Sequence, residues 1–320
     1  SQDSEFWFED GSVTLVVEET GFFVFKSVLA RQSKFMSRLF EGQADVPDDV
    51  TIFHDGTEGM VICFRSDIAQ EWRHVLRGCM SQHRTLLLPG DPPPHPSAEQ
   101  VFAYVRLGRK YEFTGLYESA MRYLRNYFPT NLTRWRQLSR YVPPQFTMID
   151  AVGVVNIARL APDLSILPTA LFACCVSTRP EIVVGDAQLD QRHGRLSEED
   201  VALCWKARTR LVAVTSSSLL AVVSPILLSD CGSISFHGDL CKAAAPHFLQ
   251  AVETQIAKDE KNPLQSVVSR FDEGLLQKLC PQCLAGLKDR SQKIARQNWN
   301  KLPSLLGLEN LDVEWEKEDV

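Results

Sequence analysis

One stretch near the N-terminus constrains the fold most, because its pattern changes from strand to helix within a few residues. A β-branched apolar run covers 13–17, and after the turn sequence EETG, which ends at Gly21, a second apolar run covers 22–25. Two such runs around a glycine predict a β-hairpin. Ser27 and Ser33 then stand where helix N-caps are preferred, ahead of VLARQ and KFMSRLF. We therefore expect a hairpin followed directly by two short helices.

Strand and helix patterns continue to alternate along this part of the chain. The apolar run GMVICF, residues 59–64, is too short for a helix and predicts a third strand. After Ser66 and Asp67, residues 68–80, IAQEWRHVLRGCM, place their apolar side chains on one helical face. A proline-rich loop, LPGDPPPHPS, ends at Ser97, a suitable cap for two further helices that break near 112–115.

Beyond Pro129 the strand patterns nearly vanish and helical patterns recur, at about 150–160, 167–176, 197–217, 240–258, 263–279 and 283–302. A chain of 320 residues suits about two domains. We therefore expect an α+β protein. A small sheet with helices forms a first domain, residues 1–130, and a mainly α-helical domain of unknown role covers residues 131–320.

The composition is typical of a soluble globular protein, with 44% apolar and 23% charged residues. The longest apolar run, near 219–228, is interrupted by Ser224 and Pro225 and falls short of the roughly 20 residues that a membrane span needs. The net charge of −6 and the lack of basic blocks disfavour nucleic-acid binding. Nine cysteines without a regular disulfide framework fit a reducing compartment. We expect a cytoplasmic or nuclear protein without a membrane partner.

The order of the expected elements resembles that of the BTB/POZ domain: a hairpin, a short helix pair, a strand, a helix and a second helix pair. Residues 13–40, VTLVVEETGFFVFKSVLARQSKFMSRLF, are similar to that family's two strands ending in Phe-x-x-His-Lys, its tripeptide Val-Leu-Ala and its serine-capped helix. Residues 101–124, VFAYVRLGRKYEFTGLYESAMRYL, resemble the family's paired helices with their L-A-x-K-Y element. The whole layout is similar to uncharacterised fungal BTB/POZ-domain proteins with a helical C-terminal region, a likeness that implies no activity.

The resemblance also implies a dimer interface. In the family, an Asp at the start of the first strand helps to shape a charged groove between the two copies. Here that position is Ser12, with Asp10 two residues upstream, and the family's His before the Lys is Phe25, followed by Lys26. The resemblance therefore places a dimer groove at Asp10, Ser12, Phe25 and Lys26.

Many members of the family recruit cullin-type scaffolds of ubiquitin ligases. In those adaptors a loop after the second short helix carries a hydrophobic residue, any residue and then Glu. The nearest match here is Val46-Pro47-Asp48, with Asp in place of Glu, so Val46 and Asp48 are the implied partner-binding residues. The resemblance thus implies a protein-interaction module that self-associates or recruits a protein partner, with a ubiquitin-ligase substrate adaptor as one form.

Two other classes of function stay open. One is a transcription or chromatin regulator with a structural zinc site in the C-terminal half, and the other is an enzyme carried by the helical half. Glycine-rich phosphate loops, G-x-S-x-G and H-E-x-x-H are absent from the sequence, and the seven histidines are scattered. We therefore expect no catalytic residues and predict that the protein is not an enzyme.

The sequence Cys280-Pro281-Gln282-Cys283 has the spacing of a zinc knuckle, because two thiolates so placed can both reach one ion at about 2.3 Å. A second pair of ligands must complete the tetrahedron. The nearest candidates in the sequence are Cys231 and Cys241, with His237 and His247 as substitutes. This reading predicts a structural zinc that clamps the C-terminal helices.

Two alternatives compete with zinc. Free cysteines behave as small buried hydrophobic residues, which suits Cys174, Cys175 and Cys204 on their helical faces. A C-P-x-C pair is also typical of a redox dithiol, although such motifs usually stand in a strand-rich context.

Overall fold

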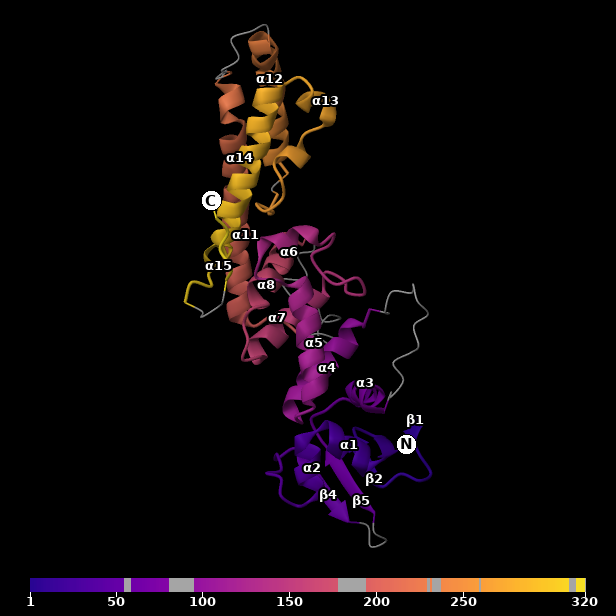
Figure 1. Ribbon diagram of the computed structural model, residues 1–320. Helices are drawn as coiled ribbons and strands as arrows, with labels where there is room; N and C mark the ends of the chain where they lie inside the picture. Colours follow the sequence, from indigo (N-terminus) through magenta and orange to yellow (C-terminus); the bar gives the residue numbers. More distant parts are fainter. Residues whose placement is uncertain are drawn as a thin grey trace, which may run out of the picture. The chain divides into compact units, whose positions relative to one another are not determined.

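The computed structural model describes residues 1–54, 59–80, 95–177, 194–228, 231, 237–258, 260–310 and 315–319, with the backbone alone for 237–240. The chain divides into two compact units. The first contains Ser1–Asn126 and Pro143–Phe146, and the second contains Tyr127–Val142 and Thr147–Val320. A small five-stranded sheet lies in the first unit and the second is mostly helical, so the expected α+β class is confirmed (Figure 1).

The sheet of the first unit has the strand order β1-β3-β2-β5-β4. Its strands are β1 (Gln2–Trp7), β2 (Val13–Val17), β3 (Thr20–Val24), β4 (Val50–His54) and β5 (Met60–Phe64). β2 and β3 form the expected antiparallel hairpin, and β5 pairs with β2 in parallel. β1 pairs in parallel with β3, and β4 pairs antiparallel with β5. The sequence patterns did not predict β1 or β4.

The hairpin turn lies earlier than expected. β2 ends at Val17 and β3 begins at Thr20, so the turn residues are Glu18 and Glu19, and Glu18 takes the positive φ of 54°. Gly21 belongs to β3 instead, where a Cβ atom would stand 3.3 Å from the Trp7 ring. The glycine therefore allows β1 to approach β3 rather than making the turn.

Five helices complete the first unit: α1 (Lys26–Gln32), α2 (Lys34–Phe40), α3 (Ala69–Met80), α4 (Ala98–Lys110) and α5 (Thr114–Tyr127). Ser33 caps α2 and Ser97 caps α4, as expected. Ser27 does not cap α1, which begins at Lys26 with Phe25 before it. The buried side chains of the sheet and helices form one core around Trp72, Tyr111 and Phe64.

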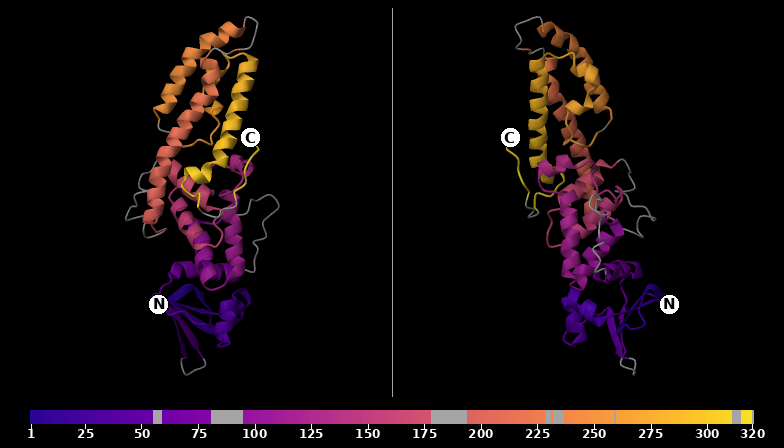
Figure 2. Two further views of the ribbon diagram at one scale, coloured as in Figure 1. Left: turned by 90° about the vertical axis from the view of Figure 1, so that its left-hand side faces the viewer. Right: turned by 45° about the vertical axis from the view of Figure 1, so that its right-hand side comes forward.

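The helical unit contains α6 (Leu132–Gln137), α7 (Asp150–Leu160), α8 (Leu167–Val176), α11 (Glu198–Leu227), α12 (His237–Ile256), the 3-10 turn η1 (Val268–Arg270), α13 (Glu273–Leu276), α14 (Pro281–Asn300) and α15 (Leu302–Leu305). α11 contacts α8, α12 and α14. Figure 2 shows α11, α12 and α14 side by side along most of their length.

Two sequence-based helix predictions were wrong in this unit. The helix expected at 263–279 is broken into η1 and α13, because Asp272 accepts a hydrogen bond from the backbone N–H of Leu275 and starts a new short helix there. The helix expected to end near residue 217 continues to Leu227 through Pro225. Pro225 leaves the Ala221 carbonyl without its usual helical donor, and the Ser224 hydroxyl donates to that carbonyl at 3.3 Å.

In the part of the chain that the structure describes, α11 is the one helix whose length and composition would allow it to cross a membrane. Ser224 and Pro225 therefore do not interrupt the helix that contains most of the apolar run 219–228. The buried residues of that run, Leu219, Val222, Val223 and Ile226, belong to the core of the helical unit.

Candidate metal centre

Four cysteines from three places in the sequence meet in the helical unit. Cys231 lies in the connection between α11 and α12, and Cys241 lies on α12. Cys280 is the N-cap residue of α14, and Cys283 lies in its first turn. Pro281 at the first position of α14 suits a helix start, because it has no N–H to leave unpaired. The local sequence thus turns both thiols of the C-P-x-C motif toward the helix N-terminus.

The sulfur atoms of these four cysteines all lie within 4.8 Å of one another. Cys231 Sγ is 3.8 Å from Cys280 Sγ and 3.5 Å from Cys283 Sγ. These separations are far longer than a disulfide bond of about 2.05 Å. Four thiolates bound at about 2.3 Å to one tetrahedral ion would stand about 3.8 Å apart. The cluster therefore fits the size of a tetrahedral site for one ion.

Backbone N–H groups support negative charge on two of the sulfurs. Cys283 N–H donates to Cys280 Sγ at 3.4 Å, and Cys280 N–H donates to Cys241 Sγ at 3.2 Å. The first of these bonds, together with hydrogen bonds from the neighbouring thiols, outweighs burial and lowers the pKa of Cys280 to about 7. Burial raises the pKa of Cys241 and of Cys283. A cation would favour the thiolate form of all four, since metal ligands must be deprotonated.

The surroundings of the cluster are apolar. Cys241 and Cys280 are 3% and 5% exposed, and both belong to a core that includes Phe248 and Leu279. Cys231 and Cys283 are half-buried and pack against the same core. The four cysteines expected as metal ligands are thus brought together, and they join the start of α14 to α12 and to the connection before it.

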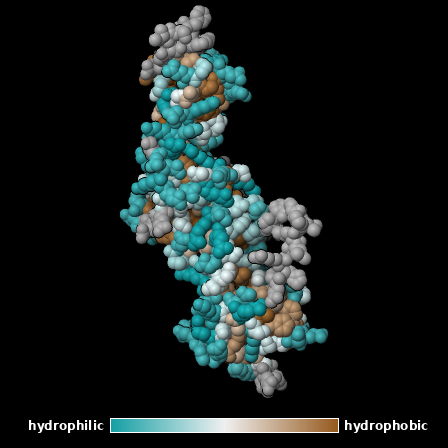
Figure 3. All heavy atoms as spheres, viewed as in Figure 1, coloured by the Kyte–Doolittle hydropathy of each residue, from teal (hydrophilic) through white to brown (hydrophobic). Residues whose placement is uncertain are grey.

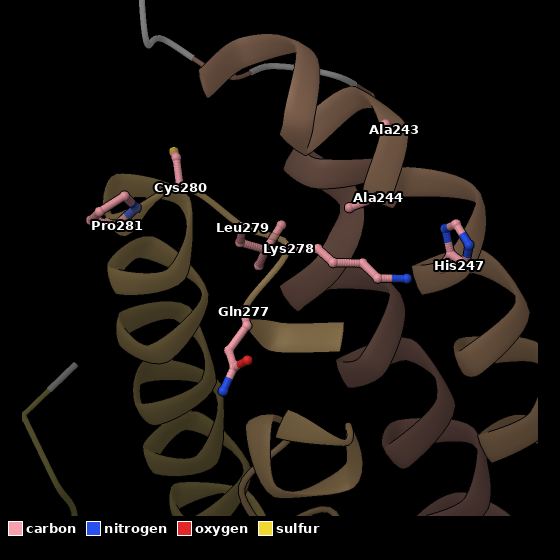
Figure 4. Close-up of a pocket in the computed structure, with 8 residues that line it drawn as sticks. All are labelled: Ala243, Ala244, His247, Gln277, Lys278, Leu279, Cys280 and Pro281. Carbon is pink, nitrogen blue, oxygen red and sulfur yellow. The ribbon is translucent and has the colours of Figure 1, made fainter. Parts of the chain in front are cut away.

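The two histidines considered as substitutes have different outcomes. His237 has no described side chain, so that prediction lies outside the described residues. His247 is exposed on α12 and lines a cavity of about 500 Å³ next to the cluster. Figure 4 shows Cys280 at one side of this cavity and His247 at the other. Four sulfurs are sufficient for a tetrahedral set without either histidine.

The other cysteines of the helical unit are ordinary buried thiols. Cys174 and Cys175 are 0% exposed and Cys204 is 1% exposed, as their helical positions predicted. Burial raises the pKa of Cys174, and Cys175 Sγ donates to the Cys204 carbonyl at 3.9 Å. These three thiols are not part of the four-cysteine cluster.

The residues expected at a dimer groove lie close together in the first unit. Ser12 Oγ accepts a hydrogen bond from the backbone N–H of Lys26 at 2.9 Å, which satisfies a free donor at the start of α1. Phe25 stacks on Phe8 with ring centroids 5.2 Å apart. Asp10 is exposed in the turn before β2. The Ser12 hydroxyl and the Lys26 backbone N–H therefore also have a structural role at the start of α1.

Val46 and Asp48, the residues expected to bind a partner, are both exposed in the segment between α2 and β4. Three larger apolar side chains of the first unit also reach solvent: Phe53 is 53% exposed, Ile68 46% and Trp7 37%. On the face seen in Figure 3, hydrophobic residues come to the surface over this unit. The sequence analysis did not single out Trp7 or Phe53, and it placed Ile68 on the apolar face of a helix at 68–80, whereas Ile68 precedes α3 and is exposed.

A second cavity in the helical unit, of about 390 Å³, was also missed from the sequence. Arg136, Arg140, Tyr141 and Asn262 line it, together with Trp135 and several smaller residues. Its two walls come from segments more than one hundred residues apart, and no motif marks either of them.

Comparison with known protein families, with curated proteins and with solved structures finds no match for this chain. The interpretation of its sites therefore depends on its own residues and geometry.

Proposed function

We propose that this protein is a non-enzymatic protein-interaction module, with a BTB/POZ-like first unit and a helical unit clamped by structural zinc. The observation that carries the interaction role is the order of elements in the first unit. The first unit contains, in order, β1, the hairpin β2–β3, the helix pair α1 and α2, the antiparallel strands β4 and β5, α3 and the helix pair α4 and α5, and β5 pairs in parallel with β2. Without β1 and β4, this is the order that the resemblance implies.

The edges and surface of the first unit support this role. In the described sheet, β4 pairs with β5 alone, so the backbone groups of its outer edge are available to a partner strand. Phe53 lies on β4 and is 53% exposed. An exposed aromatic residue beside a free strand edge is a suitable anchor for another chain.

The adaptor form of the proposal rests on the segment between α2 and β4. Val46 is 37% exposed and Asp48 is exposed, so both side chains can reach a partner. Recruitment of a cullin-type scaffold would use this pair, and self-association would use the groove at Asp10, Ser12, Phe25 and Lys26. The two uses involve different residues and can be separated by substitution.

We expect the full chain to have the mass of a dimer in light scattering, and Lys26→Glu to shift it toward a monomer, because the change replaces the one positive charge of the groove by a second negative charge. Lys34→Glu, on the exposed start of α2, is the matched control and should leave the mass unchanged. Val46→Asp combined with Asp48→Lys should abolish binding of a purified cullin-type scaffold without changing the mass. A chain that stays monomeric and binds no scaffold would contradict the proposal.

The zinc part of the proposal rests on the four sulfur atoms within 4.8 Å of one another. A closed set of four thiolates leaves no position for substrate, so the ion would be structural. It would fix the start of α14 to α12 and to the connection from α11, and metal binding of this kind contributes directly to folding free energy. Neither of the two alternatives, plain buried thiols or a redox pair, requires four sulfurs to converge.

Elemental analysis of the purified chain should find about one zinc per chain. Cys280→Ser with Cys283→Ser removes two of four ligands and should eliminate the metal and lower the thermal midpoint. Cys63→Ser, a half-buried thiol on β5, is the control and should keep the metal. Metal-free protein, or equal zinc in both variants, would return the cluster to the plain-thiol alternative.

A further inference from the structure

The cavity of about 390 Å³ in the helical unit has a polar lining that the proposed interaction and zinc roles do not use. One wall is the end of α6 and the residues after it, including Trp135, Arg136 and Tyr141. The other wall is the segment 262–266, which begins with Asn262. Both walls belong to the helical unit.

Hydrogen bonds hold two polar lining residues of the cavity, Tyr141 and Asn262, in place. Asn262 Nδ2 donates to the Tyr141 hydroxyl oxygen at 2.7 Å, and Asn262 Oδ1 accepts from the backbone N–H of Leu264 at 3.1 Å. Arg270 Nη2 donates to the Asn262 carbonyl at 2.7 Å. Because the Tyr141 oxygen accepts from Asn262, its own O–H can donate in another direction. Asn262 thus fixes the position of the Tyr141 hydroxyl and leaves its proton available to a ligand.

Arginines outnumber acidic residues around the cavity, although the charge of Glu260 acts on Tyr141 and Arg270 and that of Glu318 acts on Arg136. Arg136 and Arg140 line the cavity, and Arg270 adjoins it through Asn262. Burial lowers the pKa of Arg136, and repulsion from Arg296 lowers it further, whereas Glu318 raises it. Arg270 Nε is buried and has no hydrogen-bond partner among the described residues. An anion at Arg136 would offset the repulsion that Arg296 exerts on it.

The acidic group whose charge acts on Arg136, Glu318, belongs to the C-terminal segment. Glu318 N–H donates to Asn300 Oδ1 at 2.8 Å, and Asn300 Nδ2 donates to the Glu318 carbonyl at 2.9 Å. This pair of bonds fixes the backbone of Glu318 beside the end of α14. Its carboxylate is therefore a natural competitor for an anion at Arg136, and removing its charge should strengthen anion binding.

The donors favour a phosphate group over a carboxylate. Guanidinium groups match phosphate oxygens in pairs, and a phosphate has more acceptor oxygens than a carboxylate for the donors of the arginines and Tyr141. The cavity is also larger than a bare phosphate. Trp135, Leu138 and Leu264 give it an apolar side where an organic group can pack.

We propose that this cavity binds a small organic phosphate, with Arg136 and the Tyr141 hydroxyl on the phosphate and the Trp135 side of the cavity against its organic group. This inference is independent of the proposed interaction and zinc roles.

Isothermal titration calorimetry of the full chain with phenyl phosphate, inorganic phosphate and benzoate tests it. We expect phenyl phosphate to bind tightest, because it satisfies both the polar and the apolar side. Inorganic phosphate should bind more weakly, and benzoate at least about tenfold more weakly than phenyl phosphate, since it has the ring but only a planar carboxylate. Equal binding of benzoate and phenyl phosphate, or no binding of either phosphate, would overturn the proposal.

Substitutions distinguish this site from general attraction to a basic surface. Arg136→Gln should weaken phenyl phosphate at least about tenfold, and Tyr141→Phe should weaken it severalfold. Arg134→Gln is the matched control, because Arg134 is exposed on the same helix and does not line the cavity; its affinity should stay within about twofold. Glu318→Gln should strengthen binding. If Arg134→Gln weakens binding as much as Arg136→Gln, the site assignment is wrong.

Discussion

At the scale of single residues, Asp67 is a buried carboxylate of the first unit that accepts hydrogen bonds from three side chains. It is 7% exposed and lies between β5 and α3. Its carboxylate accepts from Trp72 Nε1 at 2.9 Å, from the Tyr111 hydroxyl at 2.7 Å and from Lys110 Nζ at 2.6 Å. Burial raises the pKa of Tyr111, so its hydroxyl remains a donor. Asp67 thus joins the sheet, α3 and the end of α4.

Asp67→Asn should destabilise the first unit by about 2 to 3 kcal/mol. One carboxylate oxygen is replaced by an amide nitrogen, which cannot accept a hydrogen bond, so at least one of the buried donors loses its partner. Urea denaturation followed by tryptophan fluorescence measures the loss. Asp48→Asn, at an exposed position, should change the free energy of unfolding by less than about 0.5 kcal/mol. Similar losses in the two variants would show that the network around Asp67 contributes little.

At the scale of elements, β1 is an example of a strand that tertiary contacts create. Its sequence, QDSEFW, has little strand pattern. It forms because Phe6 fills the core at 4% exposure and because α3 holds its acidic side chains. Arg73 Nε donates to Asp3 at 2.7 Å, where the Asp3 side chain is 2% exposed, and Arg77 pairs with Glu5 at the surface.

The attachment of β1 should be lost in acid. Burial opposes ionisation of Asp3, but hydrogen bonds from Arg73 and from the backbone of Glu5 and Phe6 outweigh it, so its pKa is lowered below 3.8. A carboxyl whose pKa is lower when folded stabilises the folded state above its unfolded pKa, and this contribution disappears as pH falls through its folded pKa.

Asp3→Asn should therefore cost about 1 to 3 kcal/mol at pH 7, and this difference from the natural chain should shrink below about pH 4. Urea unfolding at pH 7, 5 and 3 measures it. Glu5→Gln is the control on the same strand, and its exposed pair should be worth about 1 kcal/mol or less at any pH. A difference for Asp3→Asn that does not depend on pH would contradict the assignment.

The helices show the same division between local pattern and tertiary contact. α7 and α8 have the bounds that their apolar patterns predicted, 150–160 and 167–176. α11 ends ten residues later than predicted, because a proline near the end of a helix removes only one backbone bond and Ser224 supplies a substitute donor. The sequence analysis took Ser224 and Pro225 as an interruption of an apolar run, and the helix continues through both.

At the scale of the whole molecule, the two units have separate cores and separate candidate sites. Residues from Phe6 to Phe113 form the core of the first, and residues from Leu219 to Leu287 form a core of the second. The exposed residues of the proposed interaction role lie in the first unit, and the four-sulfur cluster and the polar cavity lie in the second. Loss of zinc should therefore leave the fold of the first unit intact.

The sequence by itself determined the α+β class, the hairpin and helix pair, the break near 112–115, and the Cys280–Cys283 pair, with Cys231 and Cys241 as candidates for the second pair. Each of these follows from local chemistry: periodicity of apolar side chains, a serine at a helix start, and the C-P-x-C spacing.

Only the tertiary structure decided the rest. It formed β1 and β4, placed Asp67 among its three donors, and brought Cys231 within 3.8 Å of a sulfur 49 residues away. It also joined Tyr141 to Asn262 across 121 residues. These contacts depend on which surfaces meet when the cores are buried, and a local pattern contains no information about a partner so distant in the chain.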